Sequence, residues 1–317
     1  MTTFKKKALG LAVAAAMGVG VVGNAHAGAA AQSILDISNF AFKDAGTAAV
    51  LQLADFSALT VSDLLQNAAS LNGVTANSSD SILFPTDAFR TLNTYACSAA
   101  GNCTGGAFAD NAFVSRIGAP TRNIGLSDSR FIGNGIITGN GHATGLNETQ
   151  VFNPGNGNSQ SDITLDSRFT FVMGASRTIN ISFNSLSHLA VFNDVATGTA
   201  RAAENWTISI TQVGGGSVFQ WSPDGAAGGI VGGLEIADAC NLTTNRSVVG
   251  IGADGYDCTG FHSANTGVLL AGVAYDVQLT HGGATNARFA AVPEPATLAL
   301  LGTGLIGLGF VRRRRSA

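Results

Sequence analysis

The sequence predicts an all-β body, an antiparallel β-sandwich of the Greek-key or jelly-roll type, with a helical segment at each end of the chain. Apolar and polar residues alternate with a period of two over several stretches, glycine and small polar residues supply frequent turn signals, and amphipathic helical patterns are rare. The 317 residues divide into a helical signal peptide at 1–27, a single-domain body at 28–291 and a terminal segment with a helical membrane span at 292–317.

The body begins with a strand expected over residues 34–42. Residues 62–71 fit a capped short helix and a strand equally well, and the sequence leaves both open. From residue 101 to residue 161 the chain is rich in loop-forming residues. Asn-Gly pairs in this region favour tight turns because both positions tolerate positive φ; they begin at Asn134, Asn140 and Asn156.

Two β-hairpins follow from the alternation of apolar and polar residues. The first joins residues 163–173 to residues 179–183 through a short Gly-Ala-Ser turn. The second joins residues 206–210 to residues 218–221 through three consecutive glycines. Each hairpin would present one apolar face to the core of the sandwich.

The last part of the body alternates again over residues 273–279. A His-Gly-Gly turn at residues 281–283 is expected to lead into a final short strand at residues 287–292. Tyr275 follows a short apolar segment in the way of a tyrosine corner, in which the hydroxyl bonds to upstream backbone. An ordinary half-buried strand tyrosine is the alternative.

The N-terminus has the three parts of a cleaved secretion signal. Three lysines precede an apolar stretch at residues 8–22, which is shorter than the roughly 20 residues needed to cross a bilayer. Small residues then occupy the −3 and −1 positions, Ala25 and Ala27, so cleavage is expected before Gly28. The chain should therefore pass through the secretion translocon.

All four cysteines lie in the body, and an even number in an exported chain indicates two disulfides. Three pairings are possible. Local pairs, Cys97 with Cys103 and Cys240 with Cys258, are favoured because each closes a short turn-rich loop; each should stabilise the fold by roughly 2–3 kcal/mol. The alternative, a four-cysteine zinc site, needs ligands two to four residues apart, whereas five and seventeen residues intervene here.

The charge of the body excludes several partners. It carries 10 basic and 19 acidic residues, and Lys43 is its only lysine. Nucleic acid and anionic lipid are therefore not expected to bind, because phosphates require cationic neutralisation.

The C-terminal segment combines three parts. Extended backbone is expected at Pro293 and Pro295, and an almost purely apolar run follows at residues 296–311. A cluster of positive charge then acts as a stop-transfer signal that stays in the cytoplasm, which places the body across the membrane. The cluster consists of Arg312, Arg313, Arg314 and Arg315.

The run Val292, Pro293, Glu294 and Pro295, with the apolar run and the arginines behind it, resembles the PEP-CTERM sorting domain. The resemblance covers about 25 residues and implies a Gram-negative envelope protein that an exosortase processes near this motif. It also implies an inner-membrane intermediate, delivery to the outer surface or the medium, and an association with exopolysaccharide and biofilm. The expected function is a structural or adhesive surface or matrix protein. The body itself resembles no family.

No catalytic motif is present, so an enzyme is not expected; a secreted hydrolase of polysaccharide or protein is the alternative. The match to G-x-G-x-x-G at residues 302–307 lies inside the apolar run, where small residues ease helix packing. The body histidines are far apart in sequence and are interpreted as scattered strand and loop residues, with a folded constellation of one of them with Asp and Ser as the alternative; they are His142, His188, His262 and His281. No cofactor is expected. Calcium is the least implausible metal, with oxygen ligands at residues 153–162 and 254–257 that also suit ordinary polar turns.

Overall fold

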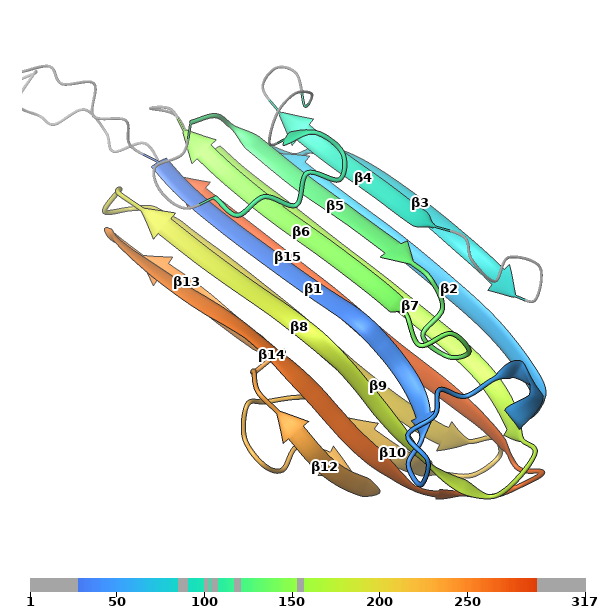
Figure 1. Ribbon diagram of the computed structural model, residues 1–317. Helices are drawn as coiled ribbons and strands as arrows, with labels where there is room; N and C mark the ends of the chain where they lie inside the picture. Colours follow the sequence, from blue (N-terminus) through green and yellow to red (C-terminus); the bar gives the residue numbers. More distant parts are fainter. Residues whose placement is uncertain are drawn as a thin grey trace, which may run out of the picture.

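A computed structural model describes residues 28–84, 91–99, 103, 108–116, 121–152 and 157–289. These residues form two antiparallel β-sheets packed face to face, which makes the body an all-β sandwich (Figure 1). The expected helical segments at 1–27 and 292–317 lie outside the described residues. Within the described ranges, no helix has both the length and the apolar character needed to cross a bilayer.

One sheet, here called sheet A, has seven strands in the order β12 (Gly233–Asp238), β14 (Gly252–Leu269), β8 (Arg177–Asn193), β1 (Gly28–Asp44), β6 (Gly141–Phe152), β5 (Ile124–Ile132) and β4 (Leu92–Ala99). The other, sheet B, has the order β11 (Ile230–Val231), β10 (Ser217–Trp221), β9 (Thr199–Gln212), β15 (Ala274–Phe289), β7 (Gly157–Met173), β2 (Phe56–Leu71) and β3 (Val74–Phe84), with β13 (Thr244–Val249) also paired to β9. A short 3₁₀ turn, Leu53–Asp55, precedes β2.

The chain crosses repeatedly from one sheet to the other, and this corrects the first predicted hairpin. β7 pairs with β2 and β15 in sheet B, whereas β8 pairs with β1 and β14 in sheet A. The two strands therefore belong to opposite sheets and do not pair. Alternation cannot distinguish the two arrangements, because both bury one apolar face of each strand. The second predicted hairpin is confirmed, since β9 and β10 pair directly.

The region from residue 101 to residue 161 is more regular than expected, because it contains β5, β6 and the start of β7. Its Asn-Gly pairs at Asn134 and Asn140 flank the loop of the β5–β6 hairpin. Alternation is missing in β6 because nearly every residue of this strand is buried, on both faces. Residues 62–71, which fitted a helix and a strand equally, lie in the strand β2.

The expected turn at residues 281–283 is wrong, because β15 runs through it without interruption. Gly283 is needed because the opposite sheet packs closely against it, and not because the chain turns there. A Cβ on Gly283 would lie 2.6 Å from Nδ2 of Asn147 and 3.2 Å from Oγ of Ser33, both in sheet A. Such a close approach of the opposite sheet is one reason for glycine inside a strand.

Among the described residues, the interior has three apolar clusters, of which the two largest are separated by polar side chains and the third contains Leu65 and Leu165. The larger cluster contains Trp206 and Phe183, whose ring centroids are 4.4 Å apart, and the smaller contains Leu189 and Val191. Between them, buried polar residues form hydrogen bonds across the two sheets; examples are Asn67 with Thr94 and Ser129, and Ser187 with Glu204. Each such group needs a partner because an unpaired buried polar group is costly.

The four cysteines form the two local disulfides favoured by their spacing, Cys97–Cys103 and Cys240–Cys258. The first closes a loop beside the edge strand β4, and the second ties β14 to the segment after β12. The described chain has no free cysteine, so the zinc alternative has no ligands there.

Tyr275 makes the bond of a tyrosine corner: its hydroxyl accepts a hydrogen bond of 2.9 Å from the backbone N–H of Leu270. Replacing Tyr275→Phe should cost about 1–2 kcal/mol, because the ring still packs while the N–H of Leu270 loses its acceptor. Urea denaturation would show this as a lower midpoint at an unchanged slope. An unchanged midpoint would mean that water replaces the hydroxyl without cost.

Candidate functional site

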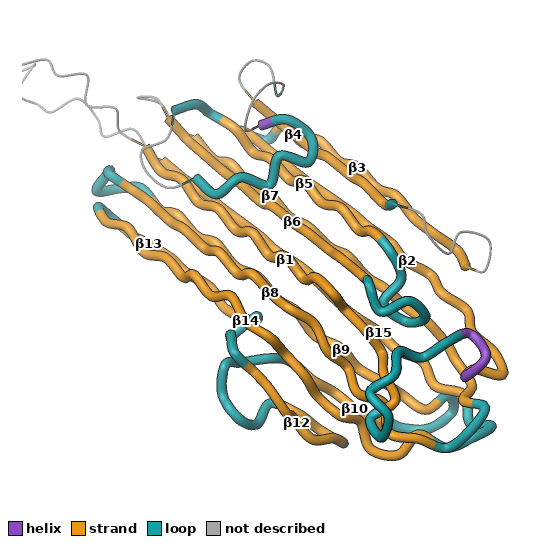
Figure 2. The backbone as a smooth tube through the Cα atoms, in the orientation of Figure 1, coloured by secondary structure: helices purple, strands orange, loops and turns teal. Residues whose placement is uncertain are grey.

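The outer face of sheet A carries a groove of about 420 Å³ that is open to solvent. This volume is in the range of ordinary ligand sites. Its walls come from β1, β6 and β8 and from the segment 108–116, which runs as a loop along the outer face of sheet A (Figure 2). The groove is lined by Ala30, Ala31, Gln32, Phe108, Ser115, Arg116, Thr121, Glu148, Gln150, Ala190, Val191 and Phe192.

An apolar patch on the outer face of sheet A holds the segment 108–116 in place. Phe108 packs with Ile34, Ile124, Leu126 and Leu146 in one buried cluster. Strand residues at these positions would face water in a simple sandwich, and the loop buries them instead. The segment is thereby fixed over the sheet by apolar contact.

Charged side chains complete this wall of the groove. The guanidinium groups of Arg116 and Arg122 lie 4.1 Å and 3.8 Å from the ring centroid of Phe108, within the range of cation–π attraction. Arg116 also forms an ion pair with the buried Glu148. Burial raises the pKa of Glu148, and the positive charge of Arg116 opposes this shift.

The side chain of Gln32 holds the backbone on both sides of Ser115. Its Nε2 donates a hydrogen bond of 2.9 Å to the carbonyl of Val114, and its Oε1 accepts one of 2.7 Å from the N–H of Arg116. Gln32 is itself buried and also donates to Glu148 at 3.1 Å. The backbone of Ser115 is therefore fixed by a rigid strand residue.

Ser115, His188 and Asp257 form a chain of hydrogen bonds at the end of the groove. Ser115 Oγ lies 3.0 Å from Nε2 of His188, and Nδ1 of His188 lies 2.5 Å from Oδ1 of Asp257. His188 and Asp257 are direct partners on neighbouring strands, β8 and β14, so both project from the outer face of sheet A. The side chain of His188 is 6% exposed and that of Asp257 is 75% exposed.

A second arrangement of the same three residue types lies inside the sandwich. Ser185 Oγ is 2.8 Å from Nε2 of His262, and Nδ1 of His262 is 3.1 Å from Oδ1 of Asp238. The His262 ring is fully buried and stacks on Phe183. Burial lowers the pKa of His262 to about 4, so the imidazole stays neutral. This arrangement satisfies buried polar groups and is closed to a substrate.

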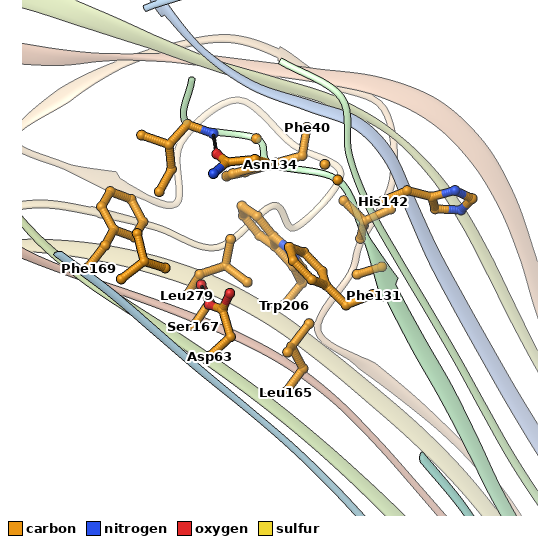
Figure 3. Close-up of a pocket in the computed structure, with 17 residues that line it drawn as sticks. Phe40, Asp63, Phe131, Asn134, His142, Leu165, Ser167, Phe169, Trp206 and Leu279 are labelled. Atoms are coloured by element: carbon orange, nitrogen blue, oxygen red, sulfur yellow. Dashed lines mark hydrogen bonds between the residues drawn. The ribbon is translucent and has the colours of Figure 1, made fainter. Parts of the chain in front are cut away.

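An apolar cavity of about 50 Å³ lies between the sheets near the β5–β6 loop. Figure 3 shows Asp63 and Ser167 below the rings of Trp206 and Phe131. Burial raises the pKa of Asp63 to about 6, although Ser167 donates a hydrogen bond to its carboxylate. The cavity has room for a few water molecules and is too small for a sugar residue.

The structure does not form a calcium site at residues 254–257. Asp254 and Asp257 are three residues apart in a continuous strand, so their side chains project from opposite faces of β14. Asp257 contacts His188, whereas Asp254 lies 4.0 Å from Arg246. No group of three or more potential metal ligands occurs in the part of the chain that is described. Side chains of the other candidate, 153–162, lie outside that part.

The expected processing sites also lie outside the described residues, except for Gly28 at the start of β1. The signal residues Ala25 and Ala27, the sorting residues from Val292 to Pro295 and the arginines from Arg312 to Arg315 therefore have no structural account. Sequence reasoning left open a constellation of one histidine with Asp and Ser, but it did not identify Ser115, His188 and Asp257 as its members. The three residues lie about 70 residues apart along the chain, and no local motif marks any of them.

Comparison with known proteins identifies the C-terminal segment. The PEP-CTERM protein-sorting motif matches residues 291–315, which include the Pro-Glu-Pro run and the arginine cluster. No curated protein matches the chain. The motif defines the class: an exported protein that an exosortase sorts to the cell surface through the membrane. Within that class, the chain is a disulfide-bonded β-sandwich with a sorting segment at its C-terminal end.

Proposed function

We propose that the protein is a structural or adhesive component of the cell surface or extracellular matrix, and that its body binds exopolysaccharide in the groove on sheet A. The sorting motif supports the location, and the groove supports the binding. The rigid polar wall of the groove is the observation that carries this proposal.

The chemistry of the groove suits a neutral polymer with many hydroxyl groups. Amide, carboxylate, guanidinium and hydroxyl groups all line it, and sugar hydroxyls both donate and accept hydrogen bonds. Nε2 of Gln150 donates a hydrogen bond of 2.5 Å to Oε1 of Glu148, and Oε1 of Gln150 accepts one of 3.0 Å from the N–H of Thr121. The polar groups are thus already ordered, which lowers the entropy cost of binding.

A glycan array probed with the exported protein tests this proposal. The variant Ala30→Phe places a ring in the groove and should weaken binding at least about tenfold, because it removes space and covers polar groups. Ala58→Phe, at an exposed position of β2 in sheet B, is the matched control and should bind as the native chain does. Equal binding by both variants, or none by the native chain, would contradict the proposal.

A secreted hydrolase is the second candidate function, and the contact between Ser115 and His188 is the observation that favours it. The expectation of a non-enzymatic body stays a prediction until activity is measured.

A further inference from the structure

We propose that Ser115 is an acyl-transfer nucleophile and that Ser115, His188 and Asp257 form an ester-cleaving site beside the groove of sheet A. The inference goes beyond the matrix role and does not depend on glycan binding in the groove. It rests on the arrangement of three side chains and on the access of Ser115 to solvent.

The order of atoms is the one that nucleophilic catalysis requires. A serine hydroxyl is a weak nucleophile until a base accepts its proton, and the base must be oriented through its other nitrogen. Here Nε2 of His188 faces Ser115 Oγ at 3.0 Å, and Nδ1 faces Asp257 at 2.5 Å. Asp257 thereby selects the imidazole tautomer that leaves Nε2 free to accept the proton.

Access to solvent separates this arrangement from the one at Ser185. Ser115 is exposed and lines the open groove, whereas Ser185 is 2% exposed and its histidine partner is fully buried. The same three residue types therefore occur once where a substrate can reach them and once where it cannot. The buried arrangement provides an internal comparison for any reagent that attacks activated serines.

The nucleophile is also fixed before substrate arrives. Gln32 holds the backbone groups of Val114 and Arg116 on either side of Ser115. The ion pair between Arg116 and Glu148 anchors the following residue. A catalytic group on a loop needs such support from a rigid element, because small displacements reduce the rate strongly.

The reaction proceeds in two balanced steps. Ser115 Oγ bonds to the ester carbonyl carbon while its proton passes to Nε2 of His188; the ester C–O bond then breaks, and the alcohol leaves with that proton. Water next gives one proton to His188 and bonds to the acyl carbon. The bond to Ser115 breaks, the carboxylic acid leaves and the serine regains its proton. Ester and water become acid and alcohol, with no other reactant.

An acyl ester suits this site better than an amide. Asp257 is 75% exposed, so water screens its support of the imidazolium. An alcohol is a better leaving group than an amine, so its departure depends less on proton donation from the protonated His188. The substrate class is therefore an O-acyl ester, carried by a polysaccharide or by a small molecule.

Covalent labelling of the processed protein, purified from an exosortase-bearing host, tests the nucleophile. A fluorophosphonate should form an O–P bond at Ser115 with loss of fluoride, and peptide mapping should find the label there and not at Ser185. Ser115→Ala should abolish labelling. Ser57→Ala, an exposed serine of β2 bonded only to the backbone of Val172, should label as the native chain does. Native labelling that survives Ser115→Ala would overturn the proposal.

Acetate release tests the substrate class, with 4-nitrophenyl acetate and an O-acetylated polysaccharide as the two arms. Ser115→Ala should slow acetate release at least about 100-fold. Asp257→Asn should slow it about tenfold, a smaller effect than for a buried triad aspartate, because Asp257 is exposed to water. Labelling without release from either ester would overturn the ester assignment. The glycan array measures the matrix role separately, so glycan binding by the native chain without labelling or acetate release would overturn the ester-cleaving site and leave the matrix role standing.

Discussion

Replacing Pro293, Glu294 and Pro295 with alanine should leave the exported chain in the inner membrane with its C-terminal segment uncleaved. The arginines from Arg312 to Arg315 keep the end of the chain in the cytoplasm, and the apolar run still inserts. The replaced residues are the part of the PEP-CTERM motif expected at the outer interface, where the two prolines favour extended backbone. Insertion should persist, and processing should stop.

Fractionation with tags before Val292 and after Ala317 measures this outcome. The native chain should lose its C-terminal tag in an exosortase-bearing host and keep it in a host without exosortase, which is the matched control. A chain truncated after Ala291 should fold and leave the membrane, because β15 ends at Phe289. Loss of the C-terminal tag from the alanine variant at the native rate would contradict the sorting interpretation.

Replacing Glu204→Gln should remove much of the pH dependence of stability between about pH 4 and pH 8. Burial raises the pKa of Glu204 to about 8, and its hydrogen bond from Ser187 only partly opposes this. The unfolded chain releases this proton near pH 4.3. The folded state therefore binds more protons in this window, and stability falls as the pH rises towards 8.

Urea denaturation at pH 5 and pH 8.5 would measure the difference. The variant should be more stable than the native chain at pH 8.5 by on the order of 3 kcal/mol, and similar to it at pH 5, because glutamine is neutral and still accepts from Ser187. Burial also raises the pKa values of Asp63 and Asp128, to about 6 and 7, so the stability of both chains depends on pH through these groups. The contribution of Glu204 is therefore the difference in unfolding free energy between the native chain and the variant. Asp254→Asn, at an exposed carboxylate, is the control. If the native chain and the variant lost the same free energy of unfolding between pH 5 and pH 8.5, Glu204 would already be ionised in the folded state.

Local patterns were sufficient to predict the two disulfides and the tyrosine corner. The cysteine spacing favoured the pairing that the structure contains, because short loops bring Cys97 to Cys103 and Cys240 to Cys258 at low entropy cost. Tyr275 was placed correctly because its partner, Leu270, is five residues away. The Ser115–His188–Asp257 contact depends on sequence separations of 73 and 69 residues, so it arises only when β8 pairs with β14 and the loop 108–116 packs on sheet A.

By itself, the sequence determined the strand-rich class, the hairpin at residues 206–221 and the C-terminal sorting motif, since each depends on neighbouring residues. The tertiary structure decided which sheet each strand joins. β7 and β8 alternate like a hairpin yet lie in opposite sheets, because alternation specifies a buried face but not the strand's neighbours. The same limit explains Gly283, which resembled a turn residue and instead leaves room for Asn147 of the facing sheet. The groove and both serine–histidine contacts likewise join residues that are distant in sequence, so only the folded chain brings them together.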